Sequence, residues 1–444
     1  MRLHHCPKAT IFGASKHEFL SRGFMNATQD VSQRKQCSED LISKLLDRRW
    51  ALEKPDTKVH QVMYPMKQSQ MKSGVFSDVN FSINAHPKLG EACMDESYKC
   101  PSFYVVRDDL LHPLANGNKA RKLDALLPMI EDFSGTDVVT CGGVQSAHAA
   151  AVAVSCAERG IRSHLLLRGE QPETLTGYNL ISSMYGNSVY VPRSIYAKRE
   201  EMLLTHAKAI AGPSGSVVWF TDILDSFADL SDELHCMGTS DYRNLEDGTK
   251  KVVIVKEGAG DAVALLGILR LVQYLSQSHI LGNKRPYNFV IDSGTGTTTI
   301  GFALGARILG LPWKITAVML ADTVDGYKKQ ESRLISDFRK YYASDLTCNT
   351  SENELINWVD RETPRKFGNV LEGEINACQQ IANQTGILVD PIYTLSAWEL
   401  AVQLSQREHE HGSKVVMLHT GGTLGMFGLA QRYKSYFSTL KGLQ

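Results

Sequence analysis

The sequence contains no long uninterrupted run of apolar residues. A helix that spans a membrane needs about 18 or more of them, and the best candidate, residues 259–275, is interrupted by Asp261 and Arg270. Acidic and basic residues balance at 48 each among 444 residues, so the chain carries no net charge. We therefore expect neither a membrane span nor a nucleic-acid surface.

Motifs for metal binding and for disulfide frameworks are also missing. The nine cysteines are scattered, with no C-x-x-C pair and no Cys/His cluster at the spacing of a zinc site. Apolar residues make up 43% of the chain, which is enough for an ordinary core without cross-links. We expect reduced thiols in a reducing compartment and no metal.

The N-terminal segment has a composition of its own. Residues 1–36 contain six basic and two acidic residues, and no acidic residue precedes Glu18. Such a basic, Ser- and Asn-containing segment without a long apolar core is typical of an organellar transit peptide and not of a secretory signal. We predict a transit peptide over residues 1–40; the alternative is an N-terminal tail without a targeting role.

After residue 100, short apolar strands alternate with glycine turns and helices. We expect strands near residues 103–106, 138–140, 161–167, 252–255, 289–291, 315–320 and 415–418, with helices at 146–158 and 265–275 among those between them. This alternation predicts α/β domains built on parallel sheets, and the length favours two domains. Residues 40–100 are predicted to be an extension with a short helix at 40–52, and residues 225–251 a surface excursion.

Three glycine turns follow predicted strands, where α/β sheets bind their ligands. In the first, residues 114–123, Lys119 stands where a loop becomes a helix. Burial and the positive helix end would favour its neutral, nucleophilic amine. On this motif alone, a solvated basic helix start is the favoured interpretation.

The other two turns are typical of anion sites. In residues 141–148, a Gly-Gly turn leads to Ser146 at a helix N-terminus, which suits a carboxylate or is an ordinary N-cap. In residues 292–301, glycines and threonines can wrap around a phosphate. The Walker lysine is missing there and the spacing is not G-x-G-x-x-G; the alternative is a flexible turn. Two later segments, residues 390–394 and 416–425, read singly as core-to-loop transitions.

The ordered combination of motifs resembles a known family. R-D-D-L, G-N-K-A-R-K-L, G-G-V-Q-S, S-G-T-G-T-T, D-P-I-Y-T and H-T-G-G follow one another between about Phe103 and Phe427. They resemble the D-cysteine desulfhydrases and 1-aminocyclopropane-1-carboxylate (ACC) deaminases, most of all the plant mitochondrial members. That resemblance implies a mitochondrial location and a homodimer.

The resemblance also implies a fold and a cofactor. The fold is the tryptophan-synthase-β-like type II fold of pyridoxal 5'-phosphate (PLP) enzymes, with two open, twisted parallel-sheet domains and the cofactor in the cleft between them. On this basis we expect a large domain of residues 41–123 and 252–444 and a small domain of residues 124–251.

Carried over motif by motif, the resemblance implies roles for particular residues. Lys119 would hold PLP as a Schiff base, with Asn118 beside it, and would act as the catalytic base. Ser146 and Tyr393 would act at the substrate. The remaining cofactor contacts would come from Gly294, Thr295, Gly296, Thr297, Thr298 and Thr394.

Three positions bear on the choice of reaction. ACC deaminases resemble one another in having Glu where this chain has Thr394, beside the pyridine nitrogen. A neutral Thr makes PLP a weaker electron sink, which suffices for β-elimination but not for ring opening. A second family Tyr corresponds to Phe367, which also argues against ACC deamination. Ala147 replaces the usual Asn, at a cost of about 1 kcal/mol for one hydrogen bond; His148, next to it, is expected to point elsewhere on the helix.

We therefore predict β-elimination of D-cysteine to pyruvate, hydrogen sulfide and ammonia, with a small amino acid as the substrate. Within the same class of enzyme, ACC deamination and elimination from L-cysteine or serine stay open. Outside it, the sequence also allows a non-catalytic PLP-binding protein or a nucleotide-binding α/β module. Spacing does not distinguish D from L substrates.

Overall fold

The computed structural model describes residues 40–65, 79–91, 100–115, 117–233, 249–342, 354–408, 414–438 and 440. The predicted transit peptide lies outside the described residues except for Asp40, as do residues 234–248 of the predicted surface excursion. Residues 225–233 of that excursion belong to helix α7 (Phe220–Glu233).

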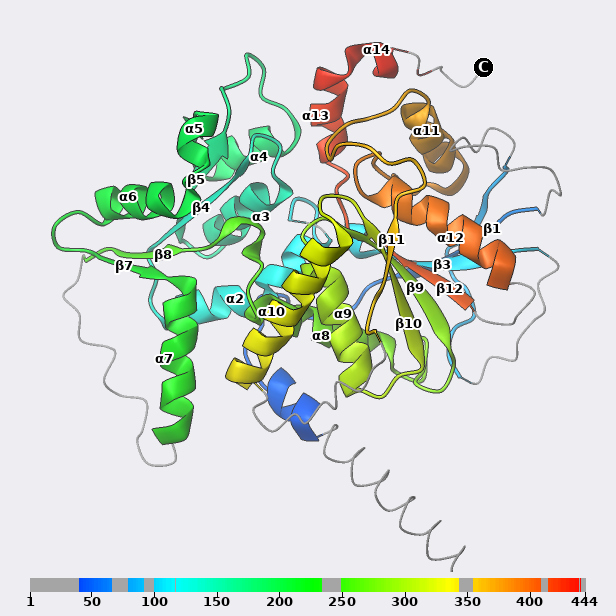
Figure 1. Cartoon of the computed structure of the whole chain (residues 1–444), viewed down its shortest axis with the longest axis horizontal. Helices are drawn as coiled ribbons and strands as arrows, with labels where there is room; N and C mark the ends of the chain where they lie inside the picture. The colour runs from blue at the N-terminus through cyan, green and yellow to red at the C-terminus, as the bar shows by residue number, and fades with distance from the viewer. Residues whose placement is uncertain are drawn as a thin grey trace, which may run out of the picture.

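Two sheets form the frame of the molecule (Figure 1). The larger has the strand order β11 (Asn357–Asp360), β10 (Trp313–Met319), β9 (Tyr287–Ser293), β12 (Lys414–Leu418), β3 (Ser102–Val106), β1 (Val59–Met63) and β2 (Ser82–Asn84). The smaller has the order β6 (Asn187–Val191), β5 (Arg162–Arg168), β4 (Asp137–Gly143), β8 (Lys251–Ile254) and β7 (Ser216–Trp219). Every pairing in the smaller sheet and every pairing from β11 to β3 is parallel. The predicted α/β architecture with parallel sheets is confirmed.

The segment before residue 100 is more than an extension. β1 pairs antiparallel with β3 over five residues, from Val59 opposite Val106 to Met63 opposite Ser102, and β2 pairs antiparallel with β1. These strands complete the edge of the larger sheet. A short helix is present here, but it covers residues 40–46 and not 40–52.

Helices cover both faces of the larger sheet because successive strand residues point to opposite sides. Tyr104, Val106 and Phe289 face one core, to which α2 (Asn118–Asp132), α8 (Val263–Leu275), α9 (Thr297–Ile308) and α10 (Val324–Tyr342) contribute. Phe103 and Val105 face the other core, formed with α11 (Glu374–Thr385) and α12 (Thr394–Glu408). Both faces are therefore buried, as expected for a parallel sheet.

The smaller sheet is covered in the same way. α3 (Ala147–Ala157) packs against β4 and β5, α4 (Gly177–Tyr185) packs against α3 and β6, and α6 (Arg199–Ala211) packs against β4, β7 and β8. The remaining short elements are η1 (Asp108–Leu110), α5 (Arg193–Tyr196), η2 (Glu257–Ala259), α13 (Gly425–Arg432) and α14 (Lys434–Phe437). β8 is the last strand of the smaller sheet along the chain, and the boundary predicted between residues 251 and 252 lies within it. The other predicted boundary, after residue 123, falls inside α2.

Helix α8 is the centre of the larger core. Residues Glu257–Leu275 are apolar and long enough to cross a membrane by composition, but 78% of the relevant window is buried inside the protein. A Cβ atom on Gly267 would lie 2.0 Å from the carbonyl oxygen of Arg121. The backbones of α2 and α8 therefore touch at this glycine, and α8 is a core helix that fixes α2.

Candidate active site

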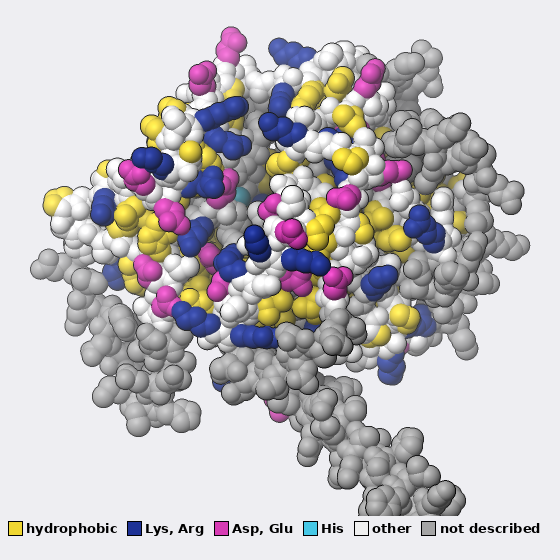
Figure 2. Space-filling view, in the orientation of Figure 1, with side chains coloured by type: hydrophobic (Ala, Val, Ile, Leu, Met, Phe, Trp, Pro, Cys, Tyr) yellow, Lys and Arg dark blue, Asp and Glu magenta, His cyan; other side chains and the backbone are white. Residues whose placement is uncertain are grey.

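A cleft of about 990 Å³ lies where the carboxyl ends of β9 and β12 in one sheet face the carboxyl end of β4 in the other. Ligands of α/β folds bind at such strand ends. Figure 2 shows the molecule hollowed between the two sheets, with Lys and Arg side chains around the hollow. The arginines that line the cleft include Arg168, Arg193, Arg199 and Arg432.

The start of α2 brings Lys119 into this cleft. Gly117 precedes the helix with a φ of +65°, and a Cβ atom there would lie 1.9 Å from the carbonyl oxygen of Thr420. The same carbonyl accepts a 3.0 Å hydrogen bond from the backbone N–H of Asn118. One turn on, the buried guanidinium of Arg121 binds both carboxylate oxygens of Asp108, at 3.1 and 2.8 Å. The start of α2 is thus fixed by the Thr420 carbonyl on one side and by Asp108 on the other.

The Lys119 amine is a weaker base than an ordinary lysine. Burial lowers the pKa of Lys119 to about 8, although the Asp292 carboxylate opposes this shift. The Nζ atom donates a 2.8 Å hydrogen bond to Oδ1 of Asn118. The interpretation of Lys119 as a solvated basic residue is therefore wrong, because the amine lines the cleft and is readily deprotonated.

A second lysine that the sequence reasoning did not select lies beside Lys119. Lys122 is buried, and its Nζ atom donates to the Gly258 carbonyl at 3.2 Å and to Oγ1 of Thr295 at 3.3 Å. Burial and the neighbouring Lys119 hold the pKa of Lys122 well below its usual value. The spacing of three residues places both amines on one face of α2, and this signal was present in the sequence.

The turn between β9 and α9 forms an anion cup. Gly296 adopts a left-handed conformation (φ +77°) directly before the helix. Oγ1 of Thr298 is buried and has no hydrogen-bond partner within the described part of the chain. The hydroxyls of Thr295 and Thr297 are 3.1 Å apart. Free N–H groups at the start of α9 together with these hydroxyls suit a phosphate group.

Tyr327 supports this cup from behind. Its hydroxyl lies 2.5 Å from the Ser293 carbonyl and 2.8 Å from the Gly294 carbonyl, to which it donates. Its ring stacks on Trp358, with centroids 4.6 Å apart and an interplanar angle of 18°. Ser293 and Thr299 hydroxyls are also joined, at 2.6 Å. The carbonyls of the turn are thus turned away from the cleft, which leaves donors facing the anion.

Ser146 lies opposite the cup as the N-cap of α3. Its Oγ atom accepts a 3.2 Å hydrogen bond from the backbone N–H of Ala149. Gly142 leaves the space for this hydroxyl, since a Cβ atom there would lie 2.4 Å from Ser146 Oγ. The helix N-terminus and the hydroxyl together form a second anion-binding surface, of a size that suits a carboxylate.

His148 is also among the residues at the cleft, and its imidazole is hydrogen-bonded to β4. Its Nε2 atom lies 3.0 Å from Oγ1 of Thr140, and the side chain is buried. Burial lowers the pKa of His148 to about 3, and the charges of Lys119 and Lys122 add to this effect. A neutral imidazole therefore lies next to Ala147, which also lines the cleft.

Two buried carboxyl groups form the floor of the cleft, and the sequence reasoning gave neither a role. Asp292 accepts a 2.6 Å hydrogen bond from the Thr420 hydroxyl, and its pKa is raised to about 7, chiefly by burial. Asp390 accepts hydrogen bonds from the backbone N–H groups of Ile392 and Tyr393, both at 2.9 Å. Burial raises the pKa of Asp390 as well.

Thr394 lies behind this floor. It is fully buried, and among the described residues it is not one of those that line the cleft. Its hydroxyl donates to Oδ2 of Asp390 at 2.9 Å and accepts from the backbone N–H of Asp390 at 2.8 Å. Thr394 thus positions Asp390, and its contact with the cofactor stays a prediction.

Tyr393 and Phe367 form one side wall. Their rings meet edge to face with centroids 5.6 Å apart, and both line the cleft. A Cβ atom on Gly294 would lie 3.2 Å from Cε1 of Tyr393, so the tyrosine packs closely on the cup. Burial and the nearby Asp390 raise the pKa of Tyr393, so its hydroxyl keeps its proton at neutral pH.

Comparison with known proteins identifies the family. A protein of Oryza sativa subsp. japonica named "Putative D-cysteine desulfhydrase 2, mitochondrial" is 52% identical over 395 residues, which cover 88% of this chain and 94% of that protein. The chain belongs to the D-cysteine desulfhydrase/ACC deaminase family. The D-cysteine desulfhydrase of Serratia proteamaculans is 24% identical over 81% of this chain and 97% of its own. A bifunctional D-cysteine desulfhydrase/ACC deaminase of Arabidopsis thaliana is 23% identical over 73% of each chain. No family model matches the chain.

Solved structures agree with this family on the fold. The crystal structure of an ACC deaminase homologue covers 76% of this chain and 89% of its own, with 24% identity and a TM-score of 0.56. The predicted type II fold is thereby confirmed. The two departures from the family pattern that the sequence analysis singled out, Ala147 and Phe367, both line the cleft.

Proposed function

We propose that this protein is a PLP-dependent D-cysteine desulfhydrase, which converts D-cysteine and water to pyruvate, hydrogen sulfide and ammonia. The observation that carries the proposal is the Lys119 amine, with a pKa of about 8, placed in one cleft with an anion cup and the Ser146 turn. The family relatives that carry this activity in their names support the choice of reaction.

The residues of the cleft fit PLP. The Thr298 hydroxyl, buried without a partner in the described chain, and the free N–H groups of α9 would hold its phosphate. The Lys119 amine would attach to its aldehyde carbon, and Asn118 would lie beside that bond. Bound PLP supplies a conjugated ring that withdraws electrons from the α-carbon of an amino acid.

Lys119 then moves the proton in our proposal. A base works best when its pKa lies near the working pH, and Nζ of Lys119 meets this condition because of burial. Once the amino group of the substrate has displaced it from the aldehyde carbon, the Lys119 amine would remove the proton from the substrate α-carbon. Departure of hydrosulfide from the β-carbon completes the elimination, and water converts the remaining enamine to pyruvate and ammonia.

The Ser146 turn would orient the substrate. Its hydroxyl and the N-terminus of α3 would bind the α-carboxylate on the side of the cleft opposite the cup. The guanidinium of Arg168 lies close by, with Nη2 3.9 Å from the position of a Cβ atom on Gly143. Tyr393 would close the side wall next to the reacting carbons.

The second candidate activity is ACC deamination, because the Arabidopsis relative is named for both reactions. The lining of this chain favours elimination. Asp292 and Asp390 are both held toward their neutral forms by burial, position 394 is a Thr, and Phe367 lacks a hydroxyl. The two carboxyl groups of the cleft floor would thus supply less negative charge to the cofactor ring than a Glu at position 394, so a reaction with a good leaving group is favoured over ring opening.

The test uses the purified full-length protein supplied with PLP. We expect visible absorption, sulfide release from D-cysteine, and less 2-oxobutyrate from ACC. Lys119→Ala should lose both the visible band and sulfide release, whereas Lys208→Ala, an exposed lysine on α6, should retain both. Sulfide release by Lys119→Ala at the wild-type rate would refute the assignment. Absorption without turnover of D-cysteine, L-cysteine, serine or ACC would support a non-catalytic PLP-binding protein.

We also propose a mitochondrial location and a homodimer. The basic N-terminal composition and the mitochondrial names of two relatives support the location. Import of the full chain into isolated mitochondria, compared with a chain that lacks residues 1–40, tests it. Sedimentation of the purified protein tests the dimer.

A further inference from the structure

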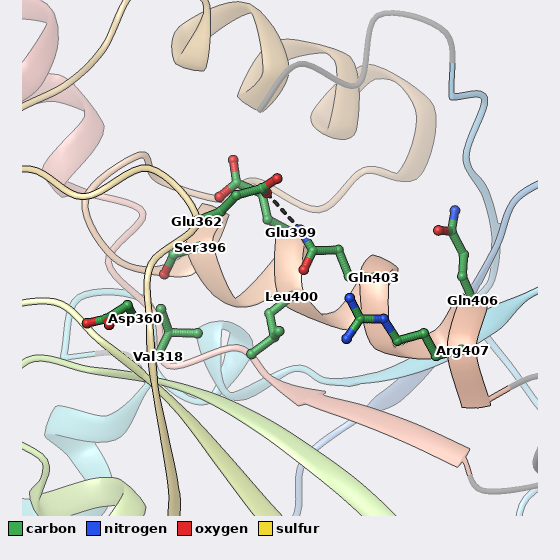
Figure 3. Close-up of a pocket in the computed structure, with 9 residues that line it drawn as sticks. All are labelled: Val318, Asp360, Glu362, Ser396, Glu399, Leu400, Gln403, Gln406 and Arg407. Atoms are coloured by element: carbon green, nitrogen blue, oxygen red, sulfur yellow. Dashed lines mark hydrogen bonds between the residues drawn. The ribbon is translucent and has the colours of Figure 1, made fainter. Parts of the chain in front are cut away.

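A second cavity, of about 480 Å³, lies along the outer side of α12 (Figure 3). One face of the helix forms its wall, together with Val318 near the end of β10 and Asp360 at the end of β11. No residue that lines this cavity also lines the cleft. The cavity is therefore a separate feature, to which the proposed reaction assigns no role.

Carboxylates gather at one end of this cavity. Figure 3 shows the side chains of Glu362 and Glu399 lying together, with Asp360 farther along the wall. Glu399 is only 7% exposed. Within the described part of the chain its carboxylate has no hydrogen bond and no ion pair, whereas Glu362 accepts a 2.8 Å hydrogen bond from Nε2 of Gln403. The oxygens of Glu399 are not among the fully buried atoms without a partner, so its carboxylate reaches the cavity, and a bound cation would offset the cost of its partial burial.

The surrounding charges do not neutralise Glu399. Arg361 binds Glu374 at 2.8 Å and the Pro391 carbonyl at 2.9 Å, and Arg365 also pairs with Glu374. Burial raises the pKa of Glu399 to about 7; Glu374 and Glu362 act in the same direction, while Arg361 and Arg365 oppose it. Glu399 therefore takes up or loses a proton near neutral pH, and a bound cation would favour its charged form.

The rest of the wall indicates what kind of cation fits. No group of at least three His, Cys, Asp or Glu side chains in the described chain is placed to hold a metal ion. Beyond the carboxylates the wall has two apolar side chains, Val318 and Leu400, and the rest of its lining is polar, with Ser396, Gln403, Gln406 and the cation Arg407. An ammonium group has three donors for carboxylate oxygens, and a short alkyl chain would cover the two apolar side chains.

We propose that the cavity along α12 binds a small aliphatic primary ammonium ion. The ammonium group binds at Glu399 and Glu362, and the alkyl chain lies over Val318 and Leu400. This site does not depend on the activity proposed for the cleft.

The direct test is calorimetric titration of n-butylammonium chloride into the PLP-loaded, full-length protein at constant ionic strength. We expect saturable binding that is at least tenfold weaker in Glu399→Gln and also weakened in Glu362→Gln, whose side chain is exposed. The matched control is Glu53→Gln, which removes an exposed carboxylate near α8 on the other face of the large sheet. Its affinity should equal that of the wild type.

Three comparisons keep the proposal open to refutation. Butan-1-ol, the neutral analogue, should bind at least tenfold more weakly, and potassium chloride should not compete. Affinity should fall about tenfold from pH 8 to pH 6, since a group with a pKa near 7 becomes protonated over this range. Equal binding by Glu399→Gln and wild type, or equal binding of the alcohol, would overturn the assignment.

The amine could also react with PLP in the cleft, so the titration is repeated with Lys119→Ala. Binding at α12 should persist in that variant even where the visible band and sulfide release are lost. Loss of all butylammonium binding in Lys119→Ala would place the amine in the cleft and refute the second site, whatever the outcome for the desulfhydrase proposal.

Discussion

The two sides of the cleft are built differently. On the large-sheet side, side chains hold the turns at the strand ends: Tyr327 binds two carbonyls of the cup, Asp390 binds two backbone N–H groups, and Thr420 binds Asp292. On the small-sheet side, Ser146 caps α3 and Gln145 donates to the Thr176 carbonyl at 3.0 Å.

Charged groups differ in the same way. On the small-sheet side, the guanidinium groups of Arg168 and Arg193 have no hydrogen bond or ion pair within the described chain, although Arg168 lies over the ring of Tyr196. On the large-sheet side, the buried Asp292 and Asp390 are both hydrogen-bonded. We infer that the large-sheet side, whose polar groups are already hydrogen-bonded, holds one cofactor in a fixed position. The small-sheet side has cations, unpaired within the described residues, that could bind a substrate.

The strongest test of a rigid large-sheet side is Gly117→Ala. Its Cβ atom would lie 1.9 Å from a backbone oxygen, at a φ of +65°. We expect a loss of more than about 4 kcal/mol in the free energy of unfolding, or failure to fold, because backbone on both sides must move. Urea unfolding measures this.

Gly160→Ala is the matched control, because Gly160 has a similar φ of +69° but no atom within 4 Å of its added Cβ. The free energy of unfolding should fall by only about 1 kcal/mol, which is the cost of placing an alanine in this left-handed backbone conformation. Equal losses in the two variants would show that the close approach at Thr420 is unimportant.

Asp292→Asn tests the large-sheet side through the pH dependence of the free energy of unfolding. The folded pKa of Asp292 is about 7 and that of an unfolded Asp is about 3.9. Between these values the folded state holds a proton that the unfolded state lacks, so rising pH lowers the free energy of unfolding. Between pH 5.5 and pH 7, the free energy of unfolding of the cofactor-free wild type should therefore fall by about 1–2 kcal/mol more than that of Asp292→Asn.

Urea unfolding across that range is the measurement, and Asp47→Asn, at an exposed position, is the control. The control should follow the wild type at every pH. If Asp292→Asn and wild type lose stability in parallel, the carboxyl group does not keep its proton in the fold.

Thr298→Val should have opposite effects in the two cofactor states. Removal of a buried hydroxyl without a partner should leave the cofactor-free protein equally stable or up to about 1 kcal/mol more stable. The dissociation constant of PLP should rise about five- to tenfold, as expected for one lost hydrogen bond. Urea unfolding and fluorescence titration with PLP measure the two effects.

The neighbouring substitution Thr299→Val is its control. The Thr299 hydroxyl is joined to Ser293, so this variant should lose about 1 kcal/mol without cofactor. A Thr298→Val protein that is destabilised by the same amount would show that the Thr298 hydroxyl has a structural partner.

The smallest structural effect is expected on the small-sheet side. Arg168→Gln should change the free energy of unfolding by less than about 0.5 kcal/mol and should leave PLP affinity unchanged. KM for D-cysteine should rise several-fold with little change in kcat, because an exposed cation beside the Ser146 turn is lost. A change in PLP affinity as large as that of Thr298→Val would remove the distinction between the two sides.

Sequence patterns predicted the parts of this molecule that depend on local residues. The strands β3, β4 and β9 are apolar runs, and the segments that follow them bring Lys119, Ser146 and Gly294–Thr298 to one cleft. Each of these residues lies next to a glycine or at a helix start, so its chemistry could be read from its neighbours along the chain.

The missed features depend on hydrogen-bond and strand partners that residue order along the chain does not reveal. β1 is short and carries the buried polar residue Gln61, and only its pairing with β3 some forty residues later makes it a strand. Thr394 was assigned to the cofactor from its motif, but its hydroxyl is already used by Asp390. His148 was given no partner in the sequence analysis, and β4 supplies one, the buried hydroxyl of Thr140.

The stack of Trp358 on Tyr327 has a practical consequence. Tyr327 holds the carbonyls of the cup, and the indole lies flat against its ring. Of the five tryptophans, Trp358 is therefore coupled most directly to the turn that would receive a phosphate. In a protein in which the other four tryptophans are replaced by Phe, the fluorescence of Trp358 alone should therefore report the binding of a phosphate group at the cup.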